Sequence, residues 1–383
     1  MKTKFLIFSI CLLFLGCLSC KKDDSVGTDS QEETAKLNAK KELDNKLKAE
    51  LISKNITSVA YCVVKNDKLL HSNAQGFADK ANNRLATDST RYLVASVSKI
   101  VTSVALMQLV EQNLIGLDDD INQFLPISIR NPKYADVKIT CRMLLSHYSS
   151  IVDDHQNSFK LDCFGVDCPM TFDDYFRNVF VSNGNYFSPD NFSNNQPGTK
   201  KSYSNLASAL VGYLVEKVSK TPFDVYCRNK IFMPLGMKKT DWRIANVPLN
   251  ELAIPYSKEI TSANPHYTSP DYPNGGLRTT VLDLSKFLRA IIGNGTLNGV
   301  QILSPASMTT MRTLQYGDTS QCLSFFYDTS TDRKLLGHTG GEKGVTSEMF
   351  YDVNTNVGVI IFANDEDAKI GTMSSLLYSY GEK

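Results

Sequence analysis

Segments typical of β-strands lie near both ends of this chain, and segments typical of helices lie between them. Residues 58–64 and 69–75 form two strand-like runs near the start. Residues 334–337, 345–352 and 357–363 are short runs of the same kind near the end, and turns separate them. Strands this far apart can share one sheet only if the intervening chain is inserted between them. The layout therefore predicts one sheet built from distant segments, with a helical lobe inserted in it.

Four segments carry a helical pattern. Leucines at near-helical spacing mark residues 35–53, and residues 283–294 and 368–380 also predict helices. Residues 96–111 are the most apolar segment, with apolar side chains on most sides of the expected helix. A helix of that composition is expected to be buried.

The first twenty residues are typical of an export signal. Lys2 and Lys4 precede the apolar run at residues 5–15, which is too short to span a bilayer comfortably. The next residues resemble a bacterial lipoprotein processing site, with Cys20 as the expected lipidated residue and Cys17 as the alternative. An ordinary cleaved secretion signal has the same layout and is the second interpretation.

A charged run at residues 21–24 follows Cys20. It resembles the surface-export signal of some Bacteroidota lipoproteins, and it is equally typical of the start of a solvated linker. We expect a protein of the bacterial cell envelope, anchored to the lipid bilayer and either facing the periplasm or exposed at the surface.

Charge and cysteine content exclude several classes of function. Lys plus Arg number 41 and Asp plus Glu number 40, which gives no electrostatic reason to expect nucleic acid as a partner. The five histidines are too few for a metal-rich protein, and the cysteines after Cys20 lack zinc-ligand spacing. Cys163 and Cys168 flank a short turn and are the expected disulfide pair. Free buried thiols account equally well for the other cysteines.

Ser96 and Lys99 open the most apolar helical segment. Positions three apart lie on one face of a helix, so the lysine amine reaches the serine hydroxyl. The first turn adds a positive dipole and free backbone N–H groups. A lysine in an apolar pocket loses basicity and can accept a proton near neutral pH. The pair is a candidate nucleophile and base, although this spacing occurs roughly twice by chance in a chain of such length.

Two further motifs are candidates for the same site. Tyr203 and Asn205 follow a Pro-Gly turn and precede a helical segment. The tyrosine is suited to relay a proton, and the asparagine to position a lysine and a substrate. The run Gly-His-Thr-Gly-Gly at residues 337–341 lies between two strand-like runs, where glycines let a ligand approach the backbone. Taken alone, this run is as typical of a turn as of a site.

Together and in this order, the three motifs resemble those of the serine β-lactamase and penicillin-binding-protein superfamily, in particular its class C branch. That branch includes AmpC-type β-lactamases, D-alanyl-D-alanine carboxypeptidases, D-aminopeptidases and related esterases. Its pattern is S-x-x-K, then Y-x-N about a hundred residues later, then K-T-G or H-x-G near the C-terminus. Residues 139–147, 233–237 and 273–277 also match the family, so the resemblance covers about residues 40–380.

The resemblance implies a fold and a division of the chain. The fold class is α/β (α+β), β-lactamase/transpeptidase-like, with an antiparallel sheet built from both chain ends, flanking helices and an inserted, mostly helical lobe. We expect a signal peptide at residues 1–19, a flexible tether at 20–34 and a single catalytic domain at 35–383. Its sheet lobe covers about residues 35–95 and 265–383, and its helical lobe about 96–264.

The resemblance also implies the roles of the site residues. Ser96 is the nucleophile that forms an acyl-enzyme, and Lys99 is its activating base. Tyr203 shuttles protons to the leaving group, and Asn205 orients Lys99 and the substrate.

The third motif supplies the expected substrate-binding residues, His338, Thr339, Gly340 and Gly341. The backbone N–H groups of Ser96 and Gly341 would form the oxyanion hole. His338 stands where classical β-lactamases carry a lysine. A histidine is mostly neutral at pH 7, which weakens the case for an efficient β-lactamase and favours a peptidase or esterase.

One position departs from the family pattern. The family usually has His-Thr-Ser-Gly after its paired leucines, whereas here Ser150 replaces the glycine. We expect His147, which begins this run, to be a structural hydrogen-bonding residue.

The sequence therefore predicts an exported serine hydrolase that needs no metal or cofactor. Its expected activity is that of a D-amino-acid peptidase, a carboxypeptidase or an esterase, on cell-wall peptides, esters or β-lactams. A β-lactamase is the first alternative. The others are a non-hydrolytic sensor of penicillin or wall peptides and a structural lipoprotein whose motifs are coincidental.

Overall fold

The computed structural model describes residues 25–153, 161–257 and 263–383. The expected signal peptide at residues 1–19 and the expected lipidation site, Cys20, lie outside the described residues. In the described part of the chain, no helix combines the length and the apolar character needed to cross a bilayer.

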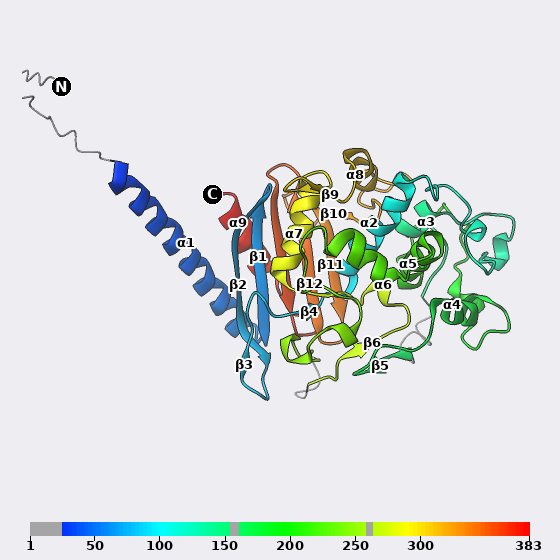
Figure 1. Cartoon of the computed structure of the whole chain (residues 1–383), viewed down its shortest axis with the longest axis horizontal. Helices are drawn as coiled ribbons and strands as arrows, with labels where there is room; N and C mark the ends of the chain where they lie inside the picture. Colours follow the sequence, from blue (N-terminus) through cyan, green and yellow to red (C-terminus); the bar gives the residue numbers. More distant parts are fainter. Residues whose placement is uncertain (1–24, 154–160, 258–262) are drawn as a thin grey trace, which may run out of the picture. The chain divides into compact units, whose positions relative to one another are not determined.

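A seven-stranded antiparallel sheet forms the centre of the fold, in the order β10-β11-β12-β13-β1-β2-β3 (Figure 1). Its strands are β1 (Ser58–Lys65), β2 (Lys68–Asp79), β3 (Arg84–Leu85), β10 (Phe326–Asp328), β11 (Leu335–Glu342), β12 (Val345–Asp352) and β13 (Val357–Ala363). Strand β1 pairs with β13, so that Val59 lies opposite Ala363. In Figure 1 the blue strands of the chain's beginning lie beside the orange strands of its end. The predicted sheet built from both chain ends is confirmed.

Helices pack on both faces of the sheet, and several of them belong to the part of the chain that is inserted between β3 and β10. They are α1 (Ser25–Ser53), α2 (Ser98–Glu111), α3 (Cys141–Leu145), α4 (Phe172–Phe180), α5 (Asn205–Ser219), α6 (Phe223–Cys227), α7 (Val281–Ile292), α8 (Pro305–Arg312) and α9 (Gly371–Gly381). Three short ladders join loops, namely β4 (Tyr92–Leu93) with β7 (Arg278–Thr279), β5 (Cys163–Phe164) with β6 (Tyr267–Thr268), and β8 (Thr296–Leu297) with β9 (Val300–Gln301).

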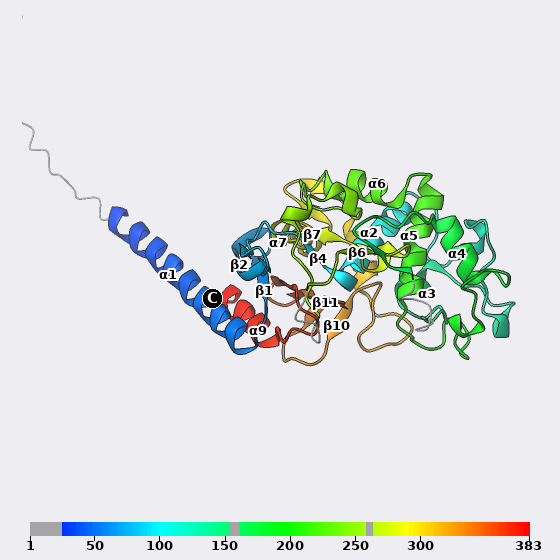
Figure 2. The same cartoon turned by 90° about the horizontal axis from the view of Figure 1, so that it is seen from below.

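Strand β1 is buried from Ser58 to Val64 and mostly apolar, because both faces of the sheet are covered. Val59 and Val63 pack in one apolar cluster with residues of α9 and the last turns of α1. Ala60 and Val64 point the other way and pack in a second cluster with residues of α7 and α2. Figure 2 shows α7 and α9 on opposite sides of β1.

Helix α1 begins at Ser25, earlier than the expected start at residue 35, so residues 25–34 are helical where a flexible tether was expected. Glu32 and Lys36 form an ion pair four residues apart, a contact that favours a helix. The compact unit that contains the sheet is Leu43–Lys383. The expected start of the catalytic domain at residue 35 is therefore earlier than the start of this unit.

The cysteines separate into one disulfide and a set of buried thiols. Cys163 and Cys168 form the predicted disulfide, which closes the turn after β5. The other cysteines of the described chain are free and buried, namely Cys62, Cys141, Cys227 and Cys322.

Helix α1 offers a matched test of where the packed core begins. Leu47 is fully buried in the cluster with β1 and α9, whereas Leu37 is 51% exposed. We expect Leu47→Ala to lower the free energy of unfolding by about 2–5 kcal/mol because it leaves a cavity in a packed cluster. Leu37→Ala should change it by less than about 0.5 kcal/mol. Urea unfolding of both variants measures this, and equal effects would contradict the assignment of the core.

Candidate active site

Ser96 lies in a single 3₁₀ turn, Ala95–Val97, that precedes helix α2. The sequence pattern predicts this serine within the helix itself, at residues 96–111. Ala95 has a φ of 45°, in the left-handed region that costs energy for any residue other than glycine. The N–H of Val94 donates to the carbonyl of Leu277 at 3.0 Å. Contacts with distant parts of the chain therefore hold this turn, since the intrinsic backbone preference of alanine disfavours the left-handed conformation of Ala95.

Strand β11 packs directly against the 3₁₀ turn that carries Ser96. The Ser347 hydroxyl of β12 donates to the Val94 carbonyl at 2.7 Å. A Cβ on Gly340 would lie 2.3 Å from that hydroxyl oxygen and 2.5 Å from the Val94 carbonyl oxygen, so only glycine fits there. Gly340, predicted to bind substrate, instead faces the turn, whereas Thr339 and Gly341 line the cavity in front of it.

Lys99 is 1% exposed and brings three separate parts of the chain together. Its Nζ donates to Ser96 Oγ at 2.8 Å, to Asn205 Oδ1 at 2.7 Å and to the Asn274 carbonyl at 2.8 Å. Three acceptors match the three N–H groups of an ammonium. They offset the cost of placing this charge inside the protein.

The same geometry orients Lys99 when it is neutral. Asn205 Oδ1 and the Asn274 carbonyl can only accept hydrogen bonds, so they take the two N–H groups of a neutral amine. The nitrogen lone pair then faces Ser96 Oγ, the third neighbour. A neutral Lys99 is thus placed to receive the serine proton.

Tyr203 approaches Ser96 from the solvent side. Its hydroxyl donates to Ser96 Oγ at 2.9 Å, and the side chain is 48% exposed. The buried His147 ring lies 4.5 Å from the Tyr203 ring between centroids, and its Nδ1 accepts from the Ser204 N–H at 3.3 Å. His147 therefore positions the tyrosine and the start of α5, which is the structural place expected for it.

Asp153 holds the N-terminus of helix α5, where Asn205 is the first residue. Its carboxylate accepts from the Ser204 hydroxyl and from the N–H groups of Asn205 and Leu206, each at 2.9 Å. A carboxylate is stabilising at a helix N-terminus. The sequence does not single out Asp153, because this residue lies 51 positions before Ser204 and belongs to no motif.

His338 lies within strand β11, opposite Met349 of β12. The run at residues 337–341 was expected between two strands, but β11 continues through it. The His338 ring is buried between Tyr203 and Phe326, and its Nδ1 donates to the Thr339 carbonyl. Burial, and then the nearby charge of Lys99, lower the pKa of His338 to about 3. His338 is therefore neutral at pH 7.

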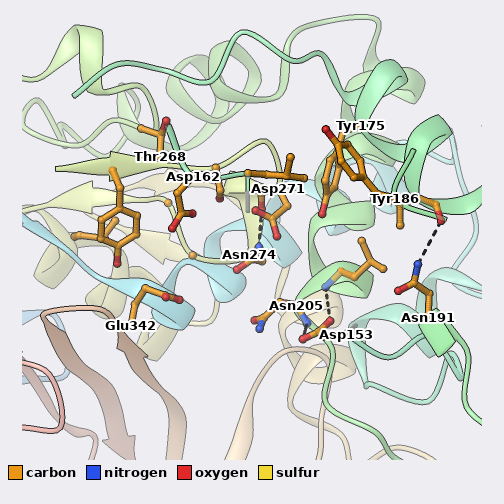
Figure 3. Close-up of a pocket in the computed structure, with 18 of the residues that line it drawn as sticks. Asp153, Asp162, Tyr175, Tyr186, Asn191, Asn205, Thr268, Asp271, Asn274 and Glu342 are labelled. Carbon is orange, nitrogen blue, oxygen red and sulfur yellow. Dashed lines mark hydrogen bonds between the residues drawn. The ribbon is translucent and has the colours of Figure 1, made fainter. Parts of the chain in front are cut away.

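Two neighbouring cavities open at these residues. The first, here called the serine cleft, has a volume of about 400 Å³ and is lined by Ser96, Tyr203, Asn205, His338, Thr339, Gly341 and Glu342, among others. The second, here called the acidic cavity, has a volume of about 230 Å³ and includes Asp153, Asp162, Asp271 and Glu342 in its wall (Figure 3). Asn205 and Glu342 line both, so the two cavities adjoin. Within the described ranges, no group of His, Cys, Asp and Glu side chains could hold a metal ion.

The depressed pKa of His338 predicts how stability depends on pH. In the unfolded chain, the side chain of His338 binds a proton below about pH 6.5. In the native protein, the same side chain stays neutral down to about pH 3. The free energy of unfolding should therefore fall as the pH falls from 6.5. The His338→Asn variant lacks this titrating group, so its free energy of unfolding should fall less steeply than that of the wild type. We expect the difference between the two slopes to be up to about 1.4 kcal/mol per pH unit. Urea unfolding between pH 7 and pH 4.5 tests this, and identical slopes in the two proteins would refute it.

The family model described as Beta-lactamase matches residues 43–371. Among curated proteins, "Protein flp" of Staphylococcus aureus (strain N315) is 22% identical over 331 residues, which cover 85% of this chain and 63% of that protein. "Beta-lactamase-like protein 4" of Dictyostelium discoideum is 24% identical over 382 residues, which cover 91% of this chain and 63% of that protein. The chain thus spans less than two thirds of the length of these relatives.

Solved structures share the fold. The D-amino acid amidase from Ochrobactrum anthropi SV3, in complex with L-phenylalanine, has a TM-score of 0.70 and 20% identity, covering 88% of this chain and 98% of that one. EstCE1, a hydrolase with promiscuous acyltransferase activity, has a TM-score of 0.68 and 16% identity, covering 91% of this chain and all of that one. The octameric penicillin-binding protein homologue from Pyrococcus abyssi has a TM-score of 0.69 and 20% identity, covering 89% and 77%. These likenesses confirm the expected fold.

Proposed function

Because the chain belongs to the Beta-lactamase family, we propose that it is a serine hydrolase that forms an acyl-enzyme on Ser96. One observation supports this most strongly. The two acceptor-only neighbours of Lys99 leave its lone pair facing Ser96 Oγ, and Tyr203 approaches the same oxygen with its hydroxyl. A serine hydroxyl between a base and a proton donor is the arrangement that nucleophilic catalysis needs.

Acylation would proceed as follows. Ser96 Oγ attacks the substrate carbonyl carbon while its proton passes to the neutral Lys99. The backbone N–H groups of Ser96 and Gly341 are the proposed donors to the oxyanion, and losing one such donor typically costs about 3 kcal/mol of transition-state stabilisation. Tyr203 gives its proton to the departing nitrogen or oxygen as the amide or ester bond breaks. An ester of Ser96, a protonated Lys99 and an ionised Tyr203 remain.

Deacylation returns these protons. The Tyr203 phenolate takes a proton from water, and the resulting hydroxide attacks the ester carbonyl. As the ester bond breaks, Ser96 Oγ recovers a proton from Lys99. The cycle thus ends with all three side chains in their starting states and with a free carboxylic acid as product.

The proposed substrates are amides or esters of D-amino acids, including peptides of the cell wall. His338 is neutral, so it offers no permanent cation for the carboxylate of a penicillin. The fold is shared with a D-amino acid amidase and with the hydrolase EstCE1, and this likeness supports the same chemical class. Turnover of β-lactams and acylation without turnover are the alternative functions.

Intact-mass spectrometry of the full chain with a penicillin and, separately, a fluorophosphonate tests this function. We expect a covalent adduct on the wild-type protein and none on Ser96→Ala, because only Ser96 is placed beside a base. A penicillin adduct that disappears as the drug is consumed would indicate a β-lactamase, and a lasting adduct a peptidase or sensor. If neither reagent labels the wild type, the proposed nucleophile is wrong.

We also propose that the protein is exported as a lipoprotein anchored through Cys20, on the basis of the N-terminal sequence pattern. Metabolic labelling of a bacterial host with an alkyne fatty acid should label the full chain. Cys20→Ser should abolish the label, whereas the matched variant Cys17→Ser should keep it. The reverse result would move the anchor to Cys17, and no label on the wild type would favour a cleaved secretion signal.

A further inference from the structure

A short backbone segment, residues 273–277, is bonded to helix α2 and is here called the strap. The Asn274 carbonyl accepts from Lys99 Nζ at 2.8 Å. The Pro273 carbonyl accepts from the hydroxyl of Thr102, about one helical turn further on, at 2.7 Å. Two consecutive carbonyls of the strap therefore bind the first turns of α2. The position of the strap decides whether Lys99 has its third acceptor.

The other end of the strap is bonded to the residues on both sides of the nucleophile. The Leu277 N–H donates to the Ser98 hydroxyl at 3.1 Å, and the Leu277 carbonyl accepts from the Val94 N–H at 3.0 Å. Val94 precedes Ser96 by two positions, and Ser98 follows it by two. A shift of the strap would therefore move the acceptor of Lys99 relative to the nucleophile.

The sequence of the strap does not fix this position by itself. Its centre is the pair Gly275-Gly276, and glycine has more backbone freedom than any other residue. A Cβ on Gly276 would lie 2.8 Å from Tyr272 Cβ, so a side chain there would collide. Figure 3 shows Asn274 in the wall of the acidic cavity, where its side chain donates to the Asp271 carbonyl at 2.7 Å. That bond joins Asn274 only to its own turn, so the strap must be held by another part of the chain.

Arg278 holds the strap from the side away from Lys99. Its side chain is 2% exposed, and the guanidinium donates to the Gly276 carbonyl at 2.8 Å. The same group donates to the carbonyls of Tyr267 and Trp242, which belong to two other segments of the chain. A guanidinium carries its N–H donors in a rigid planar fork, so these three bonds fix the relative positions of three segments.

The charge of Arg278 has no counter-ion in the part of the chain that the structure describes. Asp167 and Asp241 are the carboxylates whose charge acts on it most. Asp241 pairs instead with Arg228 at 2.9 Å, and Asp167 accepts from backbone N–H groups of a 3₁₀ turn. Burial lowers the pKa of Arg278 to about 10, so the side chain is still charged at pH 7. A buried cation without an anion costs stability, and an apolar side chain would avoid this cost. What distinguishes Arg278 from such a side chain is the set of carbonyls that it holds.

We propose that Arg278 is a positioning residue for the acylation of Ser96. By fixing the strap, it keeps the Asn274 carbonyl on Lys99, whose lone pair then faces the Ser96 hydroxyl. The inference rests on the proposed function of Ser96 and adds a residue that belongs to none of the three motifs. Arg278 also contributes to the wall of the acidic cavity, so direct contact with the acyl group of a substrate is the rival explanation.

The reaction of Ser96 with diisopropyl fluorophosphate distinguishes these explanations. The reagent is small and has no acyl group, so its rate of reaction reports the nucleophile and not the acidic cavity. We expect Arg278→Met to lower the second-order rate constant at least about tenfold, because a small misplacement of a catalytic group has effects of this size. Intact-mass spectrometry of the full chain at pH 7 measures this rate.

Two further variants separate positioning from a general loss of stability. Arg278→Lys keeps a charged donor without the planar fork, so it should recover only part of the rate. Leu47→Ala removes packing in the apolar cluster on the other face of the sheet and should leave the rate unchanged, although it lowers stability. Urea unfolding of every variant shows whether reactivity merely follows stability.

Hydrogen exchange shows whether the strap itself moves in Arg278→Met. The N–H groups of Val94 and Leu277 join the strap to the nucleophile turn and should exchange faster in this variant. The amides that pair β13 with β1 should keep their protection. Faster exchange in both places would indicate general destabilisation and would contradict a positioning role.

The outcomes separate this inference from the function on which it rests. A wild-type protein that the reagent does not label contradicts the proposed nucleophile itself. If the wild type and Arg278→Met are labelled equally fast, the positioning role is wrong and the serine hydrolase stands. An equal loss of rate in Leu47→Ala, or a failure of both Arg278 variants to fold, makes Arg278 a residue of general stability and also overturns the inference.

Discussion

The burial of Lys99 is the constraint on which the arrangement of this site depends. A buried ammonium is stable only when its N–H groups find acceptors, and these come from three distant parts of the chain. Three acceptors must therefore meet at Lys99 Nζ, namely the hydroxyl of Ser96, the side chain of Asn205 at the start of helix α5, and the carbonyl of Asn274. Asp153 secures the second of these parts, because its carboxylate fixes the start of α5.

The sheet contributes to this convergence through one close contact. Strand β11 can approach the turn with Ser96 only because Gly340 has no side chain, and the Ser347 hydroxyl fastens the neighbouring strand to the same turn. Ala95 stays in a left-handed conformation because both sides of the turn are held. The strained backbone at Ala95, next to the nucleophile, is thus maintained by the sheet and the helical lobe together.

Side-chain periodicity and motif order were sufficient to predict much of this structure. Strands β12 and β13 have the predicted bounds, and the expected family is confirmed. Strand β11 was only partly predicted because its glycines have low strand propensity and resemble a turn. The Asn274 carbonyl and the conformation of Ala95 were not foreseen, since a backbone acceptor and a backbone angle carry no residue signature.

The pairing of β1 with β13 has a consequence for how the molecule acquires its structure. The middle of the sheet joins residue 59 to residue 363, so its central ladder has no partner until almost the entire chain has been made. Contacts this distant in sequence form slowly, because a large loop must close first. Strands β1 and β2 can pair locally at once, but β1 then presents an open apolar edge. The nascent chain therefore passes through a stage in which shielding this edge decides between folding and aggregation.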